Sequence, residues 1–137
     1  MKDKKYIPAL SFNFLTGYYD WVIKKVMPEK FREILVEKIK LSPGEMLLDF
    51  WTGTAEIAIL LKKATPFSII AAIDIDPKVL NIAKRKIIKE KLDIQIIGYS
   101  GEVFPFSNNY SDKVVGCMVF NHLYPEHKRK ALLEILR

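Results

Sequence analysis

The residues on which metal sites and nucleophilic catalysis depend are scarce in this sequence. Cysteine occurs once, at Cys117 in an apolar run, which excludes an internal disulfide and predicts a small buried residue. Histidine occurs twice, at His122 and His127, and neither is spaced with carboxylates as in a metal site. No Ser-His-Asp triad can be assembled with any specificity. The sequence therefore predicts no metal centre.

Long hydrophobic runs are also absent, although 50% of the 137 residues are hydrophobic. No uninterrupted apolar stretch is long enough to span a bilayer. The charged N-terminus, residues 1–8, lacks the apolar segment that a signal peptide needs. We therefore expect a cytoplasmic protein without a transmembrane segment, and its length predicts one domain.

Acidic residues are outnumbered, with 16 Asp and Glu against 22 Lys and Arg, for a net charge of +6. The densest basic segment lies over residues 84–91, on what reads as the exposed face of a helix. We expect a solvated surface there, and a polyanion-binding face is the alternative. No RNA-binding signature or aromatic stacking motif accompanies these lysines, so no specific nucleic-acid partner is predicted.

From residue 45 onward the sequence alternates between short apolar runs, typical of strands, and segments with helical periodicity. Asp76 followed by Pro77 is typical of a helix start. The predicted strands are 46–50, 68–74, 93–97 and 113–120. The predicted helices are 54–63, 77–91 and 125–137, the last with Ala131, Leu132, Ile135 and Leu136 on one face.

Continuously apolar strands separated by helices indicate a parallel sheet that is buried on both sides. Right-handed crossovers then give a doubly wound, Rossmann-like α/β fold. Before this core, an aromatic-rich start and an amphipathic stretch predict one or two helices, stopped by Pro43 and Gly44. We predict a single domain, 1–137, made of a helical cap, 1–42, and the core, 43–137.

The stretch 47–61 changes from a strand into a helix through a short turn that contains Gly53. Such a turn presents the unpaired N–H groups of a helix N-terminus, and glycine permits close approach of a ligand. About twenty residues later a second strand ends in Asp74, which is where a carboxylate can accept hydrogen bonds from both ribose hydroxyls. This arrangement fits a dinucleotide site and an S-adenosylmethionine (SAM) site equally well.

Four segments in this order and spacing resemble the motifs of one known family. They are 14–21, 47–55, 73–77 with Ala83 and Lys84, and 100–106 followed by 112–115. With them the chain resembles class I SAM-dependent methyltransferases, most closely the ubiquinone/menaquinone C-methyltransferase-like group. The resemblance implies a sheet of order 3-2-1-4, with the C-terminal strands of the family missing here.

The resemblance also implies roles for individual residues. Asp49 and the backbone around Gly53 would hold the methionine end of SAM, and Asp74 would bind the ribose hydroxyls. Ile75 would pack on the adenine, and Tyr19 in the cap would close over the methionine carboxylate. His122 and Tyr124, just beyond the fourth strand, are the candidates for a catalytic base. The implied cofactor-binding residues are Tyr19, Asp49, Trp51, Thr52, Gly53, Asp74, Ile75, Ser100, Gly101, Glu102 and Asn121, the last ending strand four near the methyl group.

The sequence departs from the family pattern at three of its positions. Trp51 and Ala55 stand where the family usually has glycines, and Ser100 stands where it usually has an aspartate that accepts from the adenine amine. The alanine adds one methyl group, whereas the indole of Trp51 must either leave the pocket or occupy cofactor space. The direction in which this indole points decides how the turn can be used.

Three functions remain open at this stage. The first is a SAM-dependent methyltransferase, or its cofactor-binding part, acting on a small and aromatic or quinone-like acceptor. The second is a catalytically inactive methyltransferase-like module for binding or oligomerisation. A nicotinamide-dependent oxidoreductase comes third, because the glycine pattern for a pyrophosphate is missing. An exposed apolar edge at strand four predicts a homo-oligomer.

Overall fold

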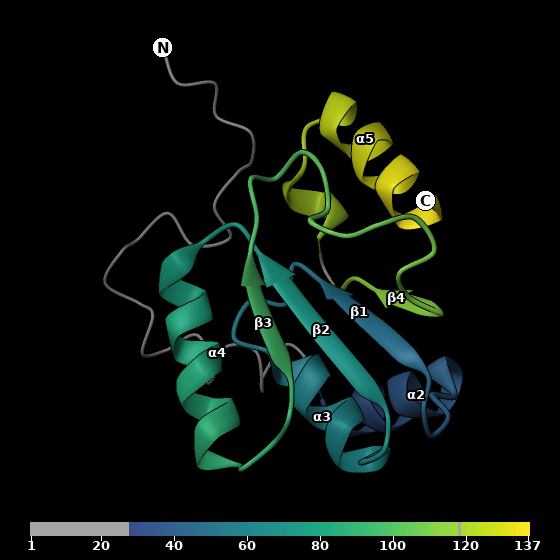
Figure 1. Ribbon diagram of the computed structural model, residues 1–137, viewed down its shortest axis with the longest axis vertical. Coiled ribbons are helices and arrows are strands. Elements are labelled where there is room, and N and C mark those ends of the chain that lie inside the picture. Colours follow the sequence, from purple (N-terminus) through teal and green to yellow (C-terminus); the bar gives the residue numbers. More distant parts are fainter. Residues whose placement is uncertain (1–27, 118) are drawn as a thin grey trace.

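The computed structural model describes residues 28–117 and 119–137, which form an α/β fold (Figure 1). Predictions for residues 1–27, including Tyr19 and most of the cap, lie outside this part of the chain. In order, the elements are α2 (Glu29–Ile39), β1 (Met46–Phe50), α3 (Glu56–Ala64), β2 (Ile69–Asp74), α4 (Pro77–Lys89), β3 (Gln95–Gly98), β4 (Lys113–Val115), the 3-10 turn η1 (Phe120–His122) and α5 (Pro125–Leu136).

The four strands form one parallel sheet of order β3-β2-β1-β4, as predicted. Register places Asp49 of β1 between Ala72 of β2 and Val115 of β4. Asp74, the last residue of β2, lies opposite Gly98 of β3. The carboxyl ends of β1, β2 and β3 therefore meet at one edge of the sheet, where polar residues follow the apolar runs.

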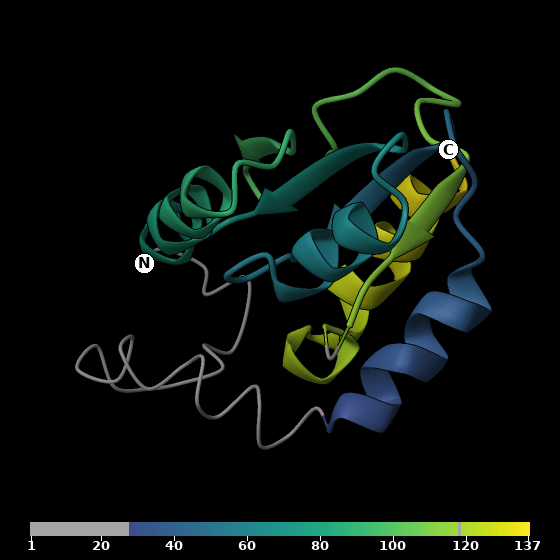
Figure 2. The ribbon, with the colours of Figure 1, turned by 90° about the horizontal axis from the view of Figure 1, so that it is seen from below.

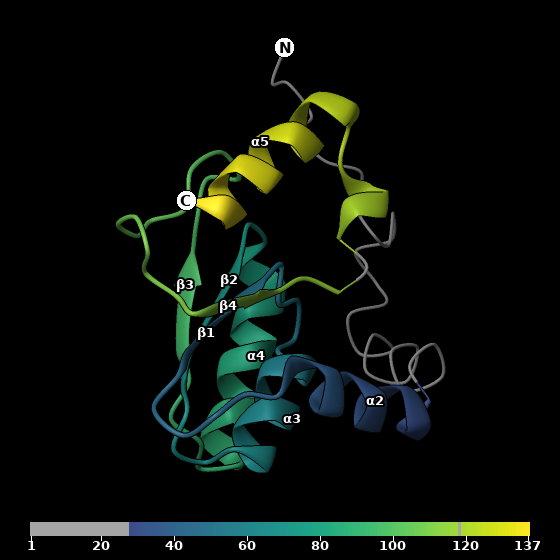
Figure 3. The ribbon, with the colours of Figure 1, turned by 90° about the vertical axis from the view of Figure 1, so that its right-hand side faces the viewer.

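Each face of the sheet packs against its own hydrophobic core. On one face, Leu47, Ile70 and Ala72 pack with residues of α2, α3 and α4. On the other face, Leu48 and Phe50 pack with residues of α5, η1 and the segment 104–110. Figure 3 shows α5 separated from α2 and α3 by the sheet. The doubly wound arrangement predicted from the alternating pattern is therefore confirmed.

Small residues in β2 allow close packing against the sheet, and a side-chain cap begins helix α4. Ala71 and Ala72 of β2 are completely buried, which leaves room for side chains packed on both faces. The side chain of Asp76 accepts a hydrogen bond from Lys78 N and caps α4, with Pro77 at its first position. Helix α2 has no buried residue and runs along the outside of the molecule (Figure 2).

The prediction that one strand covers residues 113–120 was wrong. Only three residues pair with β1, and the chain continues through Gly116 into the 3-10 turn η1. A Cβ on Gly116 would lie 3.3 Å from the ring of Phe50, so the backbone passes directly over that side chain. Asn121 therefore does not end a strand; it lies in η1 and is exposed.

The predicted apolar face of the last helix is only half covered. Ala131 is buried and Ile135 is half-buried, whereas Leu132 is 49% and Leu136 83% exposed. At the edge of the sheet, by contrast, Val115 is buried. Exposed apolar side chains thus lie on α5, and β4 is the edge strand of the sheet, as predicted.

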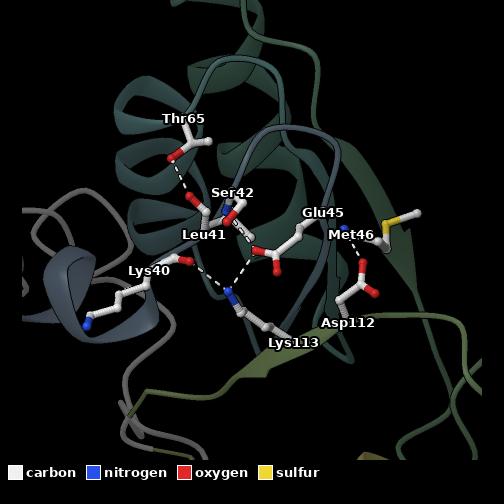
Figure 4. A network of polar contacts seen from close by, with 8 residues as sticks. All are labelled: Lys40, Leu41, Ser42, Glu45, Met46, Thr65, Asp112 and Lys113. Carbon is white, nitrogen blue, oxygen red and sulfur yellow. Dashed lines mark hydrogen bonds and ion pairs between the residues drawn. The ribbon is translucent and has the colours of Figure 1, made fainter.

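A polar network at the amino end of the sheet fixes β4 beside β1 (Figure 4). The ammonium of Lys113 donates to Glu45 Oε2 and to the Lys40 carbonyl, both at 2.7 Å. Asp112 Oδ2 accepts from Met46 N at 2.8 Å. These contacts lie at the end of β1 opposite the turn after Phe50, so they support the sheet without entering that turn.

No helix within residues 28–117 and 119–137 is long and apolar enough to cross a membrane.

Candidate functional site

The turn between β1 and α3 keeps a left-handed backbone at three alternate residues. Trp51, Gly53 and Ala55 have φ angles of 57°, 57° and 62°. Glycine adopts this conformation freely, whereas a residue with a Cβ pays roughly 1–2 kcal/mol for it. The turn thus has the shape expected of a glycine-rich motif, although two of the three glycines are replaced.

Asp49 is buried at the end of β1 and is tied to this turn. Its Oδ2 accepts from Thr52 Oγ1 at 2.6 Å, and its carboxylate also accepts from the backbone N–H of Ala58 in α3. Burial, with a smaller contribution from the nearby Asp74 carboxylate, raises the pKa of Asp49 to about 7, against the effect of these hydrogen bonds. Asp49 therefore holds the turn to the first turn of α3.

Asp74 joins the same turn from the end of β2. Its Oδ2 accepts from Gly53 N and its Oδ1 from Asp76 N, each at 2.9 Å. The side chain is 6% exposed, and burial raises its pKa, which the backbone hydrogen bonds partly offset. Because a carboxylate has about four acceptor positions, its oxygens can still accept from hydroxyls of a ligand.

The segment after β3 lies beside the segment after β2. Tyr99 N donates to the Asp74 carbonyl at 3.2 Å, and a Cβ on Gly101 would come within 3.3 Å of Ile75 Cγ2. Gly101 has φ of 86°, so the close approach and the left-handed backbone both favour glycine here. Ile75 and Gly101 are thus adjacent, as the predicted adenine site requires, while Ser100 and Glu102 are exposed beside them.

The indole of Trp51 turns toward the face of the sheet that carries α5. Its Nε1 donates to Tyr99 Oη at 2.6 Å, and its ring meets Phe50 edge-on with centroids 6.2 Å apart. Tyr99 in turn contacts Phe50 and Phe104 edge-on. Sequence reasoning singled out Trp51 but missed Tyr99, its partner across the carboxyl ends of β1 and β3.

A second missed residue is Lys86 of α4, in the basic segment expected to be solvated. Its ammonium contacts Glu56 Oε1 at 2.5 Å and Thr54 Oγ1 at 3.0 Å, and its side chain is only 20% exposed. Lys84 and Arg85, by contrast, are exposed as predicted. Lys86 therefore connects α4 to the turn through Thr54, a contact 32 residues apart in sequence that no local pattern indicates.

The remaining predicted residues are not tied to this cluster by any contact that the structure shows. Tyr124 precedes α5 and is exposed, and the side chain of His122 lies outside the described part of the chain. Over the ranges described here, no three His, Cys, Asp or Glu side chains are grouped closely enough to hold a metal ion. The candidate site thus consists of the turn 49–55, Asp74 with Ile75, and the segment 99–102.

Comparison of the sequence with known protein families finds a match. The profile of the family described as methyltransferase domain matches residues 47–137, which begin at the strand leading into the turn. The chain belongs to the methyltransferase domain family. The predicted resemblance is therefore confirmed, and membership implies SAM as the cofactor.

Curated relatives agree with this membership. A demethylmenaquinone methyltransferase from Thermotoga maritima is 29% identical over 99% of this chain, and one from Thermus thermophilus is 30% identical over 66% of it. The chain covers 58% and 40% of the lengths of these two relatives.

Two solved structures share the fold. A SAM-dependent methyltransferase from Aquifex aeolicus has a TM-score of 0.67 at 22% identity, covering 85% of this chain and 66% of that one. A protein from Pyrococcus horikoshii has a TM-score of 0.69 at 17% identity, covering 85% and 51%.

Proposed function

We propose that this methyltransferase-family chain binds SAM at the turn 49–55 and transfers its methyl group to a small, quinone-like acceptor. The observation that carries the proposal is the contact between the turn and the tip of β2, where Gly53 N donates to Asp74 Oδ2 at 2.9 Å. This contact brings the glycine turn and the ribose-binding carboxylate together at the carboxyl edge of a parallel sheet.

The residues present fit the chemistry of SAM. Asp74 keeps acceptor capacity for a ribose hydroxyl beyond its hydrogen bonds from Gly53, Ile75 and Asp76, and Ile75 with Gly101 offers an apolar, closely packed edge for adenine. Asp49 and Asp74 lie at the turn with pKa values raised by burial, and the cationic sulfonium and ammonium groups of SAM would favour their charged forms. Asp49 acts by shaping the turn, since Thr52 and Ala58 already bond to its carboxylate.

When bound, SAM supplies an electrophilic methyl group, so the cofactor itself provides the activated group for the transfer. The protein has to align acceptor and methyl carbon and to exclude water. His122 and Tyr124 remain our candidates for a base if the acceptor must lose a proton, and Asn121 for a residue near the methyl group. Tyr19 and Ser100 keep the cofactor-binding roles that the family resemblance implies.

The acceptor class rests on the curated relatives, two of which are demethylmenaquinone methyltransferases. A quinone-like ring is therefore the acceptor class that we propose for this chain. Self-association also remains a prediction, and we return to it below.

The proposal is tested by methyl transfer from SAM that carries a labelled methyl group. We expect label in a demethylated menaquinol analogue and none when the ring position is already methylated. SAM binding without transfer to any quinol would overturn the catalytic part of the proposal and favour the inactive binding module. Absence of SAM binding would overturn the whole proposal.

A further inference from the structure

Trp51 lies at a position in the turn where a large side chain could occupy the space proposed for SAM. It is the first of the three alternate left-handed residues, and its backbone φ of 57° is unusual for a bulky residue. A side chain at this position can fold over the turn or away from it. In the structure it folds away, onto the face of the sheet that carries α5.

Two contacts hold the indole in that orientation. The 2.6 Å hydrogen bond from Trp51 Nε1 to Tyr99 Oη fixes the polar edge of the ring, and the edge-on contact with Phe50 fixes its apolar face. An indole N–H in a partly buried place needs an acceptor, and loss of that acceptor leaves the N–H unsatisfied. Burial raises the pKa of Tyr99 still further above neutral pH, so its hydroxyl is protonated.

Tyr99 is itself firmly placed. Its ring contacts Phe50 and Phe104 edge-on, and its backbone N–H donates to the Asp74 carbonyl. Tyr99 directly follows β3, its backbone N–H bonds to the end of β2, and its hydroxyl bonds to the indole in the turn after β1. Its backbone and its side chain thus place one hydroxyl beside Trp51.

We propose that Tyr99 is a positioning residue that latches the Trp51 indole aside, so that the turn 51–55 stays open for SAM. This inference rests on the proposed function and adds one thing to it: access to the cofactor site depends on a hydrogen bond between two side chains that do not themselves need to touch the cofactor. The latch lets this turn carry tryptophan where the family pattern has glycine.

The experiment is a double-mutant cycle read by calorimetric titration with SAM. Tyr99→Phe removes the latch and, by the value of one hydrogen bond, weakens SAM binding about threefold to tenfold. Trp51→Phe keeps a ring but has no donor, and it weakens binding in the same range. Trp51→Gly removes the indole that Tyr99 holds aside, so this variant binds SAM at least as tightly as the wild type. Adding Tyr99→Phe to Trp51→Gly then changes nothing.

Tyr110→Phe is the matched control. The Tyr110 hydroxyl also makes a side-chain hydrogen bond, here as the donor to Gln95 Oε1 at 3.3 Å, but its ring stacks on Phe106 away from the turn. This variant keeps wild-type affinity. Urea unfolding of every variant establishes that the compared proteins are equally folded at the titration temperature.

Each outcome decides between the latch and the function on which it rests. Equal SAM affinity of wild type, Tyr99→Phe and Trp51→Phe would overturn the latch and leave the proposed function standing. A Tyr99→Phe effect that persists in the Trp51→Gly background would also overturn it, because Tyr99 would then act on SAM without Trp51. No SAM binding by any variant, Trp51→Gly included, would overturn the proposed function and the latch with it.

Discussion

Two residues of the turn hold a conformation that suits glycine better. Ala55 is completely buried and has φ of 62°. Glycine at this position avoids the steric cost but loses more backbone entropy on folding, and we expect Ala55→Gly to raise the free energy of unfolding by about 0.5–1 kcal/mol. Urea unfolding measures this change.

Ala58 provides the matched control for that substitution. It is equally buried but lies inside α3, where glycine lowers the stability by about 1 kcal/mol or more. If Ala55→Gly destabilises the protein as much as Ala58→Gly does, the left-handed backbone at residue 55 carries no strain and this part of our account is wrong.

The buried carboxyl of Asp49 makes stability depend on pH. Its folded pKa of about 7 lies above its ordinary value, so the folded state binds the proton more tightly than the unfolded state. Stability from this group is present below about pH 4 and is lost as the pH rises toward 7, by an amount on the order of 2–4 kcal/mol. Urea unfolding at several pH values between 4.5 and 7.5 measures the slope.

Asp49→Asn removes the titrating group, and we expect a flatter pH dependence over the same range. Asp93→Asn changes an exposed acid just before β3 and keeps the slope of the wild type. A slope that survives in Asp49→Asn would assign the effect to another group.

At the scale of elements, Lys86 connects helix α4 to Thr54 in the turn 49–55 and to Glu56 at the start of α3. Lys86→Met keeps the length of the side chain but removes both contacts, and we expect a loss of about 1 kcal/mol in stability together with weaker SAM binding. Lys84→Met changes an exposed lysine of the same helix and stays within about 0.5 kcal/mol of the wild type. Equal effects of the two variants would contradict the connection.

The elements were predictable from sequence to the extent that local pattern determines them. The apolar runs of β1 and β2 and the cap at Asp76 were located within a few residues, and the sheet order followed from the family resemblance. The length of β4 was not predictable, because the apolar run 113–120 continues past the last residue that pairs with β1. Gly116 packs over Phe50, and a local sequence pattern cannot predict this tertiary contact.

The candidate site divides in the same way. Asp49, Gly53 and Asp74 follow strands directly, so their position in sequence predicts their position at the sheet edge. Tyr99 and Lys86 reach the turn from β3 and α4, 48 and 32 residues away from their partners Trp51 and Thr54. Such contacts depend on side-chain direction in the folded protein, so no local sequence pattern indicates them.

For the whole molecule, the exposed leucines of α5 predict self-association. Leu132, Leu133 and Leu136 are 49%, 55% and 83% exposed on one helix. We expect sedimentation velocity to show a dimer whose population increases with protein concentration, and Leu133→Lys to shift it toward the monomer. Ile88→Lys, on the outer side of α4 where Ile88 is 74% exposed, leaves the distribution unchanged. A monomer at every concentration would refute the prediction.

Binding of SAM at the tip of β2 is measured by calorimetric titration of the wild type and of two matched variants. Asp74→Asn removes the charge that would accept from the ribose hydroxyls, and we predict about 10-fold to 100-fold weaker binding. Asp76→Asn makes the same substitution two residues later, where asparagine can still cap α4, and keeps wild-type affinity. We predict that SAM binds at one site, with equal affinity in the wild type and Asp76→Asn and lower affinity in Asp74→Asn, and that NAD does not bind. No heat of binding with millimolar SAM, or binding that is indifferent to Asp74→Asn, would contradict it.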